Sequence, residues 1–160
     1  MPTCISNSED ETKQIAAKIA RQFPCGVIAL TGELGAGKTT FVQGFAQGLG
    51  IAEKIISPTF VLIRQHQIPK TNNILFHVDL YRLEENQNLS ELGLQEIINN
   101  PSNLILIEWA EKLTDLPKGT MKISIQKINS HKRSFIIHNS LLTSTSIGPT
   151  ISLDNISISL

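Results

Sequence analysis

The sequence has few cysteines, no excess of either charge and no long hydrophobic run, and each of these shortages excludes a class of protein. Its 160 residues hold two cysteines, Cys4 and Cys25, which are too few for a disulfide framework or a cysteine metal cluster. No apolar run reaches the roughly 18 residues of a membrane-spanning helix. Because 14 Lys and Arg balance 14 Asp and Glu, the chain lacks the positive surplus of proteins that coat nucleic acid or membranes.

The overall composition is that of one folded domain. Hydrophobic residues make up 41% and charged residues 18%, which argues against a disordered chain. The first 20 residues mix Ser, acids and Lys and lack the apolar core of a signal peptide. We therefore expect a soluble cytoplasmic protein with one domain over residues 1–140. The tail 141–160 is rich in Ser, Thr and Ile and contains no chemistry that we can identify.

The hydrophobic pattern predicts an α/β protein with a mixed sheet. Ser8 and Glu11 have the spacing of a capping box, and apolar residues follow at helical intervals as far as Pro24. In chain order the predicted elements are a helix from Ser8 to Phe23, a strand at 26–31, a helix at 38–49, strands at 60–67 and 74–81, a helix at 90–100, a strand at 104–108 and a hairpin of 122–128 with 134–138. The loop between the two middle strands is short, so these strands must be antiparallel.

A phosphate-binding loop lies between the first predicted strand and the helix that follows it. Residues 32–39 read GELGAGKT and match the pattern G-x-x-x-x-G-K-[ST] at every fixed position. Glycines let successive N–H groups turn toward a phosphate, and the helix presents its positive N-terminus to the same anion. Lys38 would supply charge to the β- and γ-phosphates, and the Thr39 hydroxyl would bind Mg²⁺.

Two carboxylates follow buried strands, where an acid that holds Mg²⁺ or its waters is expected. Glu108 ends the run 104–107, and Asp79 ends the run 74–78. Asp79 could contact a metal-bound water or orient the attacking one, and the sequence does not separate these roles.

Three further features each allow a structural and a functional interpretation. Trp109, the only tryptophan, is either a packing aromatic or a group that gates the site or contacts a partner. Residues 57–60, which read SPTF, are either a turn before a strand or a switch that senses the γ-phosphate. His77 alternates with apolar neighbours, which favours a hydrogen-bonded core histidine.

These motifs, in this order, resemble those of the TsaE (YjeE) family, small bacterial P-loop ATPases required to make threonylcarbamoyladenosine in tRNA. The matching segments are LGAGKTT at 34–40, SPTF at 57–60, HVDLYR at 77–82, ELG at 91–93 and IEW at 107–109. The phosphate loop is shared by many families, whereas DLYR and EW together are specific. The resemblance covers about residues 8–137.

The resemblance implies a fold, a function and partners. The fold would be a single-domain P-loop NTPase, with a parallel core and antiparallel hairpins in one sheet flanked by helices. The protein would bind ATP and Mg²⁺ and hydrolyse ATP weakly alone. It would dock on TsaB and TsaD, reset their complex, and act on tRNA only through that complex. We expect no membrane contact and a monomer when free.

The resemblance also assigns residues to roles. The expected catalytic residues are Lys38, Asp79 and Glu108, and the metal residues are Thr39 and Glu108. The expected nucleotide contacts are Ser8, Glu9, Glu33, Leu34, Gly35, Ala36, Gly37, Lys38, Thr39, Thr40 and Arg133. The expected switch or partner residues are Ser57, Pro58, Thr59 and Trp109.

Three other functions compete with this one. A small-molecule or nucleotide kinase usually needs an arginine-bearing lid, and the sequence has no Arg cluster. A guanine-nucleotide switch would usually carry N-K-x-D, which is absent. A nucleotide-binding module without turnover is the third alternative, against which Asp79 and Glu108 argue.

Overall fold

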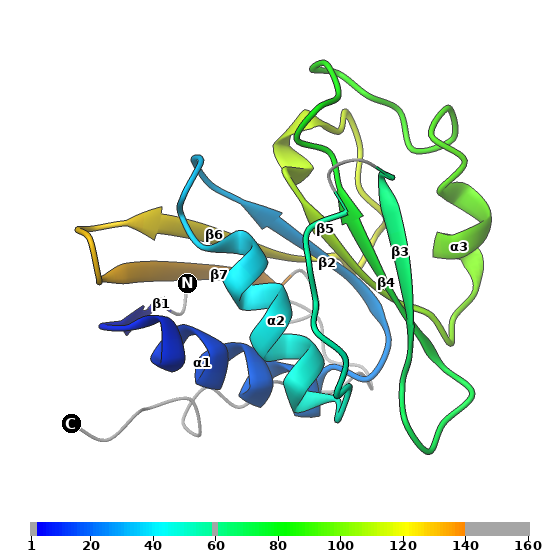
Figure 1. Ribbon diagram of the computed structural model, residues 1–160. Helices are drawn as coiled ribbons and strands as arrows, with labels where there is room; N and C mark the ends of the chain where they lie inside the picture. Colours follow the sequence, from blue (N-terminus) through cyan, green and yellow to red (C-terminus); the bar gives the residue numbers. More distant parts are fainter. Residues whose placement is uncertain (1–2, 59–60, 140–160) are drawn as a thin grey trace.

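The predicted strands assemble into one seven-stranded sheet (Figure 1). The computed structural model describes residues 3–58 and 61–139. The strands are β1 (Thr3–Ser6), β2 (Gly26–Thr31), β3 (Ile63–Gln67), β4 (Ile74–Asp79), β5 (Leu104–Glu108), β6 (Met121–Lys127) and β7 (Arg133–Asn139). The helices are α1 (Glu9–Gln22), α2 (Lys38–Gly48), α3 (Gln95–Asn99) and the 3₁₀ turn η1 (Ala110–Lys112).

The sheet is mixed, which confirms the predicted α/β class. Its strand order is β1-β7-β6-β2-β5-β4-β3. The four central strands β6, β2, β5 and β4 run parallel to one another. Antiparallel pairs complete both sides, with β3 against β4, β7 against β6, and β1 against β7. The carboxyl ends of the parallel strands therefore meet at one edge, where ligands of such sheets bind.

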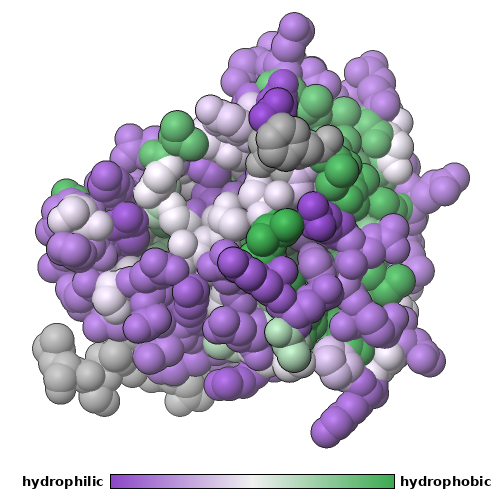
Figure 2. Space-filling model, in the orientation of Figure 1, coloured by the Kyte–Doolittle hydropathy of each residue, from purple (hydrophilic) through white to green (hydrophobic). Residues whose placement is uncertain are grey.

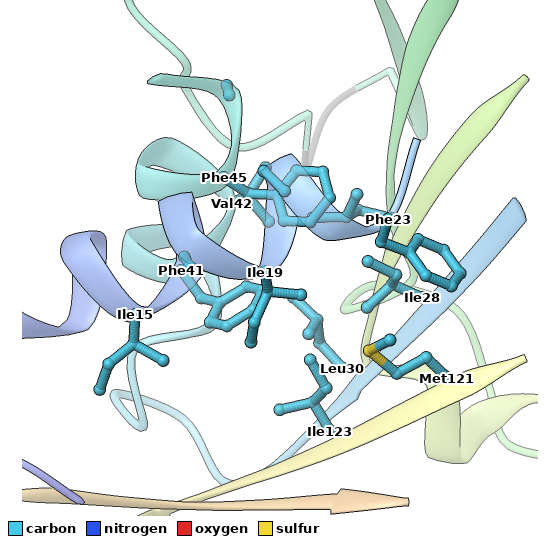
Figure 3. Close-up of a cluster of buried hydrophobic side chains, with 14 of the residues drawn as sticks. Ile15, Ile19, Phe23, Ile28, Leu30, Phe41, Val42, Phe45, Met121 and Ile123 are labelled. Atoms are coloured by element: carbon cyan, nitrogen blue, oxygen red, sulfur yellow. The ribbon is translucent and has the colours of Figure 1, made fainter. Parts of the chain in front are cut away.

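Helices α1 and α2 cover one face of the sheet and enclose the larger core (Figure 1). Side chains such as Ile19 of α1, Phe41 of α2 and Leu30 of β2 converge in it (Figure 3). Ser8 caps α1 as predicted, because its Oγ accepts a hydrogen bond from the Glu11 N–H at 3.1 Å. This cap sets the residue at which α1 begins.

The two helices approach closely because α2 has glycine where α1 crosses it. A Cβ placed on Gly44 would lie 2.3 Å from Lys13 Cα, and one on Gly48 would lie 2.6 Å from Ala17 Cα. No side chain fits at such distances without moving one helix. The pair Gly44 and Gly48 therefore sets the position of α1 over α2.

Loops and one short helix cover the opposite face. The alternate side chains of the central strands, such as Val27 and Ile107, pack there with Leu80, Leu89 and Leu94 from the segment that follows β4. Strand alternation explains why one buried sheet supplies two cores.

Four features differ from the sequence prediction. Strand β1 was not predicted, because its four residues carry little pattern of their own and pair with distant β7. The helix predicted at 90–100 is only α3, since Asn88 Oδ1 accepts the Ser90 N–H in a turn and Gly93 has φ of 70°. Strand β3 begins at Ile63, after Leu62 with φ of 63°, and β4 ends at Asp79 rather than at 81. The tail 141–160 lies outside the described residues.

The visible face is mostly hydrophilic, with hydrophobic side chains gathered over β3 (Figure 2). The large hydrophobic side chains that are exposed within the described residues are Ile5, Leu34, Ile56, Val61, Tyr81 and Ile128. Within residues 3–58 and 61–139, no helix has both the length and the apolar character needed to cross a membrane.

Candidate functional site

The phosphate loop is a glycine-built turn from β2 into α2. Gly32, Gly35 and Gly37 have φ of 141°, 78° and 105°, which side chains other than glycine rarely adopt. A Cβ on Gly32 would also lie 2.3 Å from the Ile125 carbonyl oxygen. Gly37 is the N-cap of α2 and supplies no capping side chain. The first turn of α2 is therefore suited to bind an anion.

Lys38 lies inside this turn. Its Nζ donates hydrogen bonds to the carbonyl oxygens of Gly32 at 2.5 Å and Glu33 at 3.0 Å. The same ammonium lies 3.5 Å from the centroid of the Trp109 ring. Burial lowers the pKa of Lys38 from its ordinary value, while nearby carboxylates, Glu111 first and then Glu108, oppose that shift. A phosphate in the loop would therefore meet the Lys38 ammonium and the positive N-terminus of α2 together.

Glu108 and Asp79 lie side by side. They are partners in the register of the parallel pair β4 and β5, and their exposed fractions are 2% and 5%. Because side chains alternate along strands, both carboxylates point to the face that α2 covers. The two predicted acids therefore meet at the phosphate loop.

Glu108 is joined to the phosphate loop and to the core. Thr39 Oγ1 lies 3.0 Å from Glu108 Oε1 and 2.9 Å from Oε2 and donates its proton to the carboxylate. His77 Nε2 lies 2.7 Å from Oε1. The prediction of a core histidine is right about the burial of His77, whose exposed fraction is 0%, but the sequence did not reveal its contact with Glu108.

Asp79 is joined instead to two neighbouring segments. Its Oδ2 accepts a short hydrogen bond from the Ser57 hydroxyl, and its Oδ1 accepts the Tyr81 N–H at 2.9 Å. Of the other residues predicted as a switch, Pro58 is buried, and Thr59 and Phe60 lie outside the described residues. The structure therefore brings Ser57 to the second acid.

Trp109 closes the site on the side of the two acids. It adopts φ of 60°, which turns the chain sharply after β5. Its ring lies 5.1 Å from that of Tyr81, with Lys38 on the ring face. Tyr81 was not predicted as a site residue; its place two residues after Asp79 was the available signal.

The opposite end of the site is formed by α1 and the turn between β6 and β7. Arg133 Nε donates to the Ala36 carbonyl oxygen at 3.0 Å and so braces the phosphate loop. All these parts line one cavity of about 530 Å³, a volume that suits a nucleotide. Its lining residues are Ser8, Glu9, Thr12, Leu34, Gly35, Gly37, Lys38, Thr39, Thr40, Ser57, Asp79, Tyr81, Glu108, Trp109, Ser130, His131 and Arg133.

Most of the predicted site residues line this cavity. Glu33, Ala36 and Pro58 do not; Glu33 and Ala36 contribute backbone carbonyls to Lys38 and Arg133 instead. No sequence pattern singles out Thr12, Ser130 or His131, because these polar residues reach the cavity only through the packing of α1 and the β6–β7 turn.

Comparisons with known proteins agree with this geometry. The family model "Threonylcarbamoyl adenosine biosynthesis protein TsaE" matches residues 6–135. The chain is 36% identical to the tRNA threonylcarbamoyladenosine biosynthesis protein TsaE of Treponema pallidum over 136 residues, which cover 84% of this chain and 98% of that protein. It is 39% identical to the protein of the same name from Bacillus subtilis over 130 residues, which cover 78% of this chain and 77% of that protein.

A solved structure shows the same fold. The crystal structure of YdiB from Bacillus subtilis matches with a TM-score of 0.68 and 32% sequence identity, over 87% of this chain and 85% of that chain. The family match spans more than half of the chain and includes the phosphate loop, both acids and Trp109. This chain therefore belongs to the TsaE family of threonylcarbamoyl adenosine biosynthesis proteins.

Proposed function

We propose that this chain binds ATP with Mg²⁺ and hydrolyses it in the service of tRNA threonylcarbamoyladenosine biosynthesis. The observation that carries the proposal is the contact of Thr39 Oγ1 with both oxygens of Glu108. It joins the hydroxyl of a phosphate loop to a strand-end carboxylate, which is the pairing that P-loop NTPases use.

The phosphates would bind at the N-terminus of α2. Backbone N–H groups of the loop and of the first turn would hold the phosphate oxygens, and Lys38 would add a positive charge. Its ammonium now donates to two loop carbonyls, Gly32 and Glu33, and these are the contacts that a phosphate oxygen would compete with. The nucleoside would extend toward Ser8, Glu9 and Arg133 at the other end of the cavity.

Thr39 and Glu108 suit Mg²⁺, which prefers hard oxygen ligands and usually takes only one or two of them from the protein. Within the described residues, no group of three or more His, Cys, Asp or Glu forms a metal site made by protein side chains alone. A cation held here would take its remaining ligands from phosphate and water, as Mg²⁺ usually does. When bound, it would neutralise charge on the β- and γ-phosphate oxygens.

Asp79 would act on the attacking water. The water oxygen would form a bond to the γ-phosphorus as the bond from that phosphorus to the β–γ bridging oxygen breaks, which gives ADP and phosphate. Asp79 would orient the water and accept its proton. Its contact with Ser57 would link the reaction to the segment around Ser57.

The partners would be TsaB-like and TsaD-like proteins. ATP bound at the site would hold the Ser57 segment in one arrangement, and hydrolysis would release it and reset the partner complex. The protein would reach tRNA only through that complex.

The test is phosphate release by the purified chain, alone and with its TsaB-like and TsaD-like partners. We expect low activity alone and a higher rate with both partners, with Lys38→Ala inactive in each case. A chain whose turnover the partners leave unchanged would contradict the docking role. Phosphorylation of a small acceptor in place of phosphate release would point to a kinase.

A further inference from the structure

His77 is a buried polar side chain to which the proposed reaction gives no task. It lies on β4, two residues before Asp79, and points to the same face of the sheet. Its register partner on β5 is Leu106, so Glu108 is its diagonal neighbour on that face. This placement lets the ring reach the Glu108 carboxylate from the core side.

The contact with Glu108 is short and one-sided. His77 Nε2 lies 2.7 Å from Glu108 Oε1, while Nδ1 has no hydrogen-bond partner among residues 3–58 and 61–139. A proton on Nδ1 would be left unsatisfied, so the contacts favour a proton on Nε2, donated to the carboxylate. An apolar side chain at this position would bury no unpaired nitrogen, so packing alone does not account for a histidine here.

The carboxylate of Glu108 is held from two directions. Thr39 approaches both of its oxygens from the phosphate loop, and His77 approaches Oε1 from the core. With Thr39 alone the carboxylate could still turn about its terminal bond. The second contact fixes the plane of the carboxylate, so that one oxygen is shared by His77 and Thr39 and the other contacts Thr39 without His77.

We propose that His77 is a positioning residue, which orients Glu108 toward Thr39 by donating its Nε2 proton to Oε1. The inference rests on the proposed function, because it concerns the carboxylate assigned there to Mg²⁺. Outer partners of metal-binding carboxylates commonly set the orientation of the ligand, and their loss typically lowers metal affinity about 10- to 100-fold.

Two amide variants test this role. The side-chain nitrogen of His77→Gln lies at the ε position and can still donate to Glu108, whereas that of His77→Asn lies one carbon short. Both variants bury an uncharged amide, so they share the cost of a polar group in the core. The readout is the ratio of ATP affinity with Mg²⁺ to ATP affinity with EDTA, measured by calorimetry.

We expect His77→Gln to keep the wild-type ratio within about two-fold and His77→Asn to lower it about 10-fold. Affinity in EDTA should match the wild type in both variants. Equal ratios in the two variants would overturn the positioning role. If the wild type binds ATP equally with and without Mg²⁺, the proposed function fails, and the positioning role fails with it.

A second measurement uses the unaltered protein without metal or nucleotide. Nitrogen-15 NMR of the four histidine rings, with His77 assigned from its loss in His77→Gln, reports which ring nitrogen carries the proton. A protonated Nε2 supports the inference. A neutral ring protonated on Nδ1 overturns it, and where His77→Gln does not fold the His77 signals are assigned instead from through-bond connectivity to the backbone of the unaltered protein.

Discussion

Asp79 and Glu108 are partners in one register, point to one face and are both buried, yet they belong to two different regions of the molecule. Glu108 is hydrogen-bonded to Thr39 of the phosphate loop and to His77 of the core. Asp79 is hydrogen-bonded to the Ser57 hydroxyl and to the backbone N–H of Tyr81, and both of these residues lie in loops. Glu108 is thus connected to the rigid region, by which we mean the sheet with α1 and α2. Asp79 is connected to the irregular region, by which we mean the loops that contain Ser57 and Tyr81.

This difference suggests a division of labour. Elements that pack closely on the sheet, α1 and α2 above all, hold the surroundings of Glu108. The segment after Asp79 has no regular secondary structure; Leu80 anchors it in the second core, and polar contacts such as those of Lys112 Nζ with the carbonyls of Tyr81 and Leu83 hold its backbone. A metal ligand needs fixed geometry, whereas a group that couples hydrolysis to a conformational change needs neighbours that can move.

The largest effect is expected from Glu108→Ala. Loss of the carboxylate should lower Mg²⁺-dependent ATP hydrolysis in the presence of partners on the order of 100-fold or more, since the metal's charge stabilisation is worth several kcal/mol. Binding of ATP in EDTA should change little. Lys38→Ala is the comparison, because it should abolish binding itself; equal loss of binding in both variants would contradict the division of roles.

The rigid region can be disturbed on its own through Gly44→Ala. The new methyl group would overlap the Lys13 backbone and force α1 away from α2, at a cost of about 1–3 kcal/mol of unfolding free energy. Denaturant unfolding measures the loss, and Gln47→Ala, an exposed change on the same helix, is the control. A Gly44→Ala protein as stable as the control would show that the close helix contact is not required.

The irregular region can be disturbed through Ser57→Ala. The variant lacks the hydroxyl that donates to Asp79, and a hydrogen bond to a charged group of this kind is worth about 1.5–3 kcal/mol. Amide hydrogen exchange in residues 55–57 should rise on the order of 10-fold or more, while exchange in α2 stays constant. Ser57→Thr, which keeps a hydroxyl, should resemble the wild type; unchanged exchange in Ser57→Ala would mean that the contact with Asp79 does not hold the segment.

The smallest effect is expected from the contact between the Lys38 ammonium and the Trp109 ring. Trp109 is the only tryptophan, and Lys38 lies on its ring face, a contact worth about 0.5–2 kcal/mol. ATP should draw the ammonium from the ring and change the tryptophan emission, whereas Mg²⁺ alone should not. Emission that is insensitive to saturating ATP would contradict the idea that the phosphates compete for Lys38.

The rigid region was also the more predictable one. Strands β2 and β5 were predicted at their observed bounds, because each is an apolar run with turn residues beside it. The glycine and lysine spacing was enough to predict the phosphate loop, and each acid was found at the end of its strand.

Asp79 and Ser57 of the irregular region were selected from the sequence, but the course of the chain around them escaped prediction because distant contacts shape it. Lys112 holds the backbone after β4 from about 30 positions away in the sequence, and no local pattern predicts such a contact. The pairing of His77 with Glu108 was hidden for a related reason: each residue was noted alone, and only the register of β4 and β5 makes them neighbours.

The central claim, that the two acids do different work, is tested most directly by the Mg²⁺ dependence of ATP affinity in Glu108→Gln and Asp79→Asn. Both changes remove one negative charge and keep the shape of the side chain. We predict that Glu108→Gln abolishes the gain in affinity that Mg²⁺ gives the wild type, and that Asp79→Asn retains it. A loss of that gain in Asp79→Asn, or its survival in Glu108→Gln, would contradict the account.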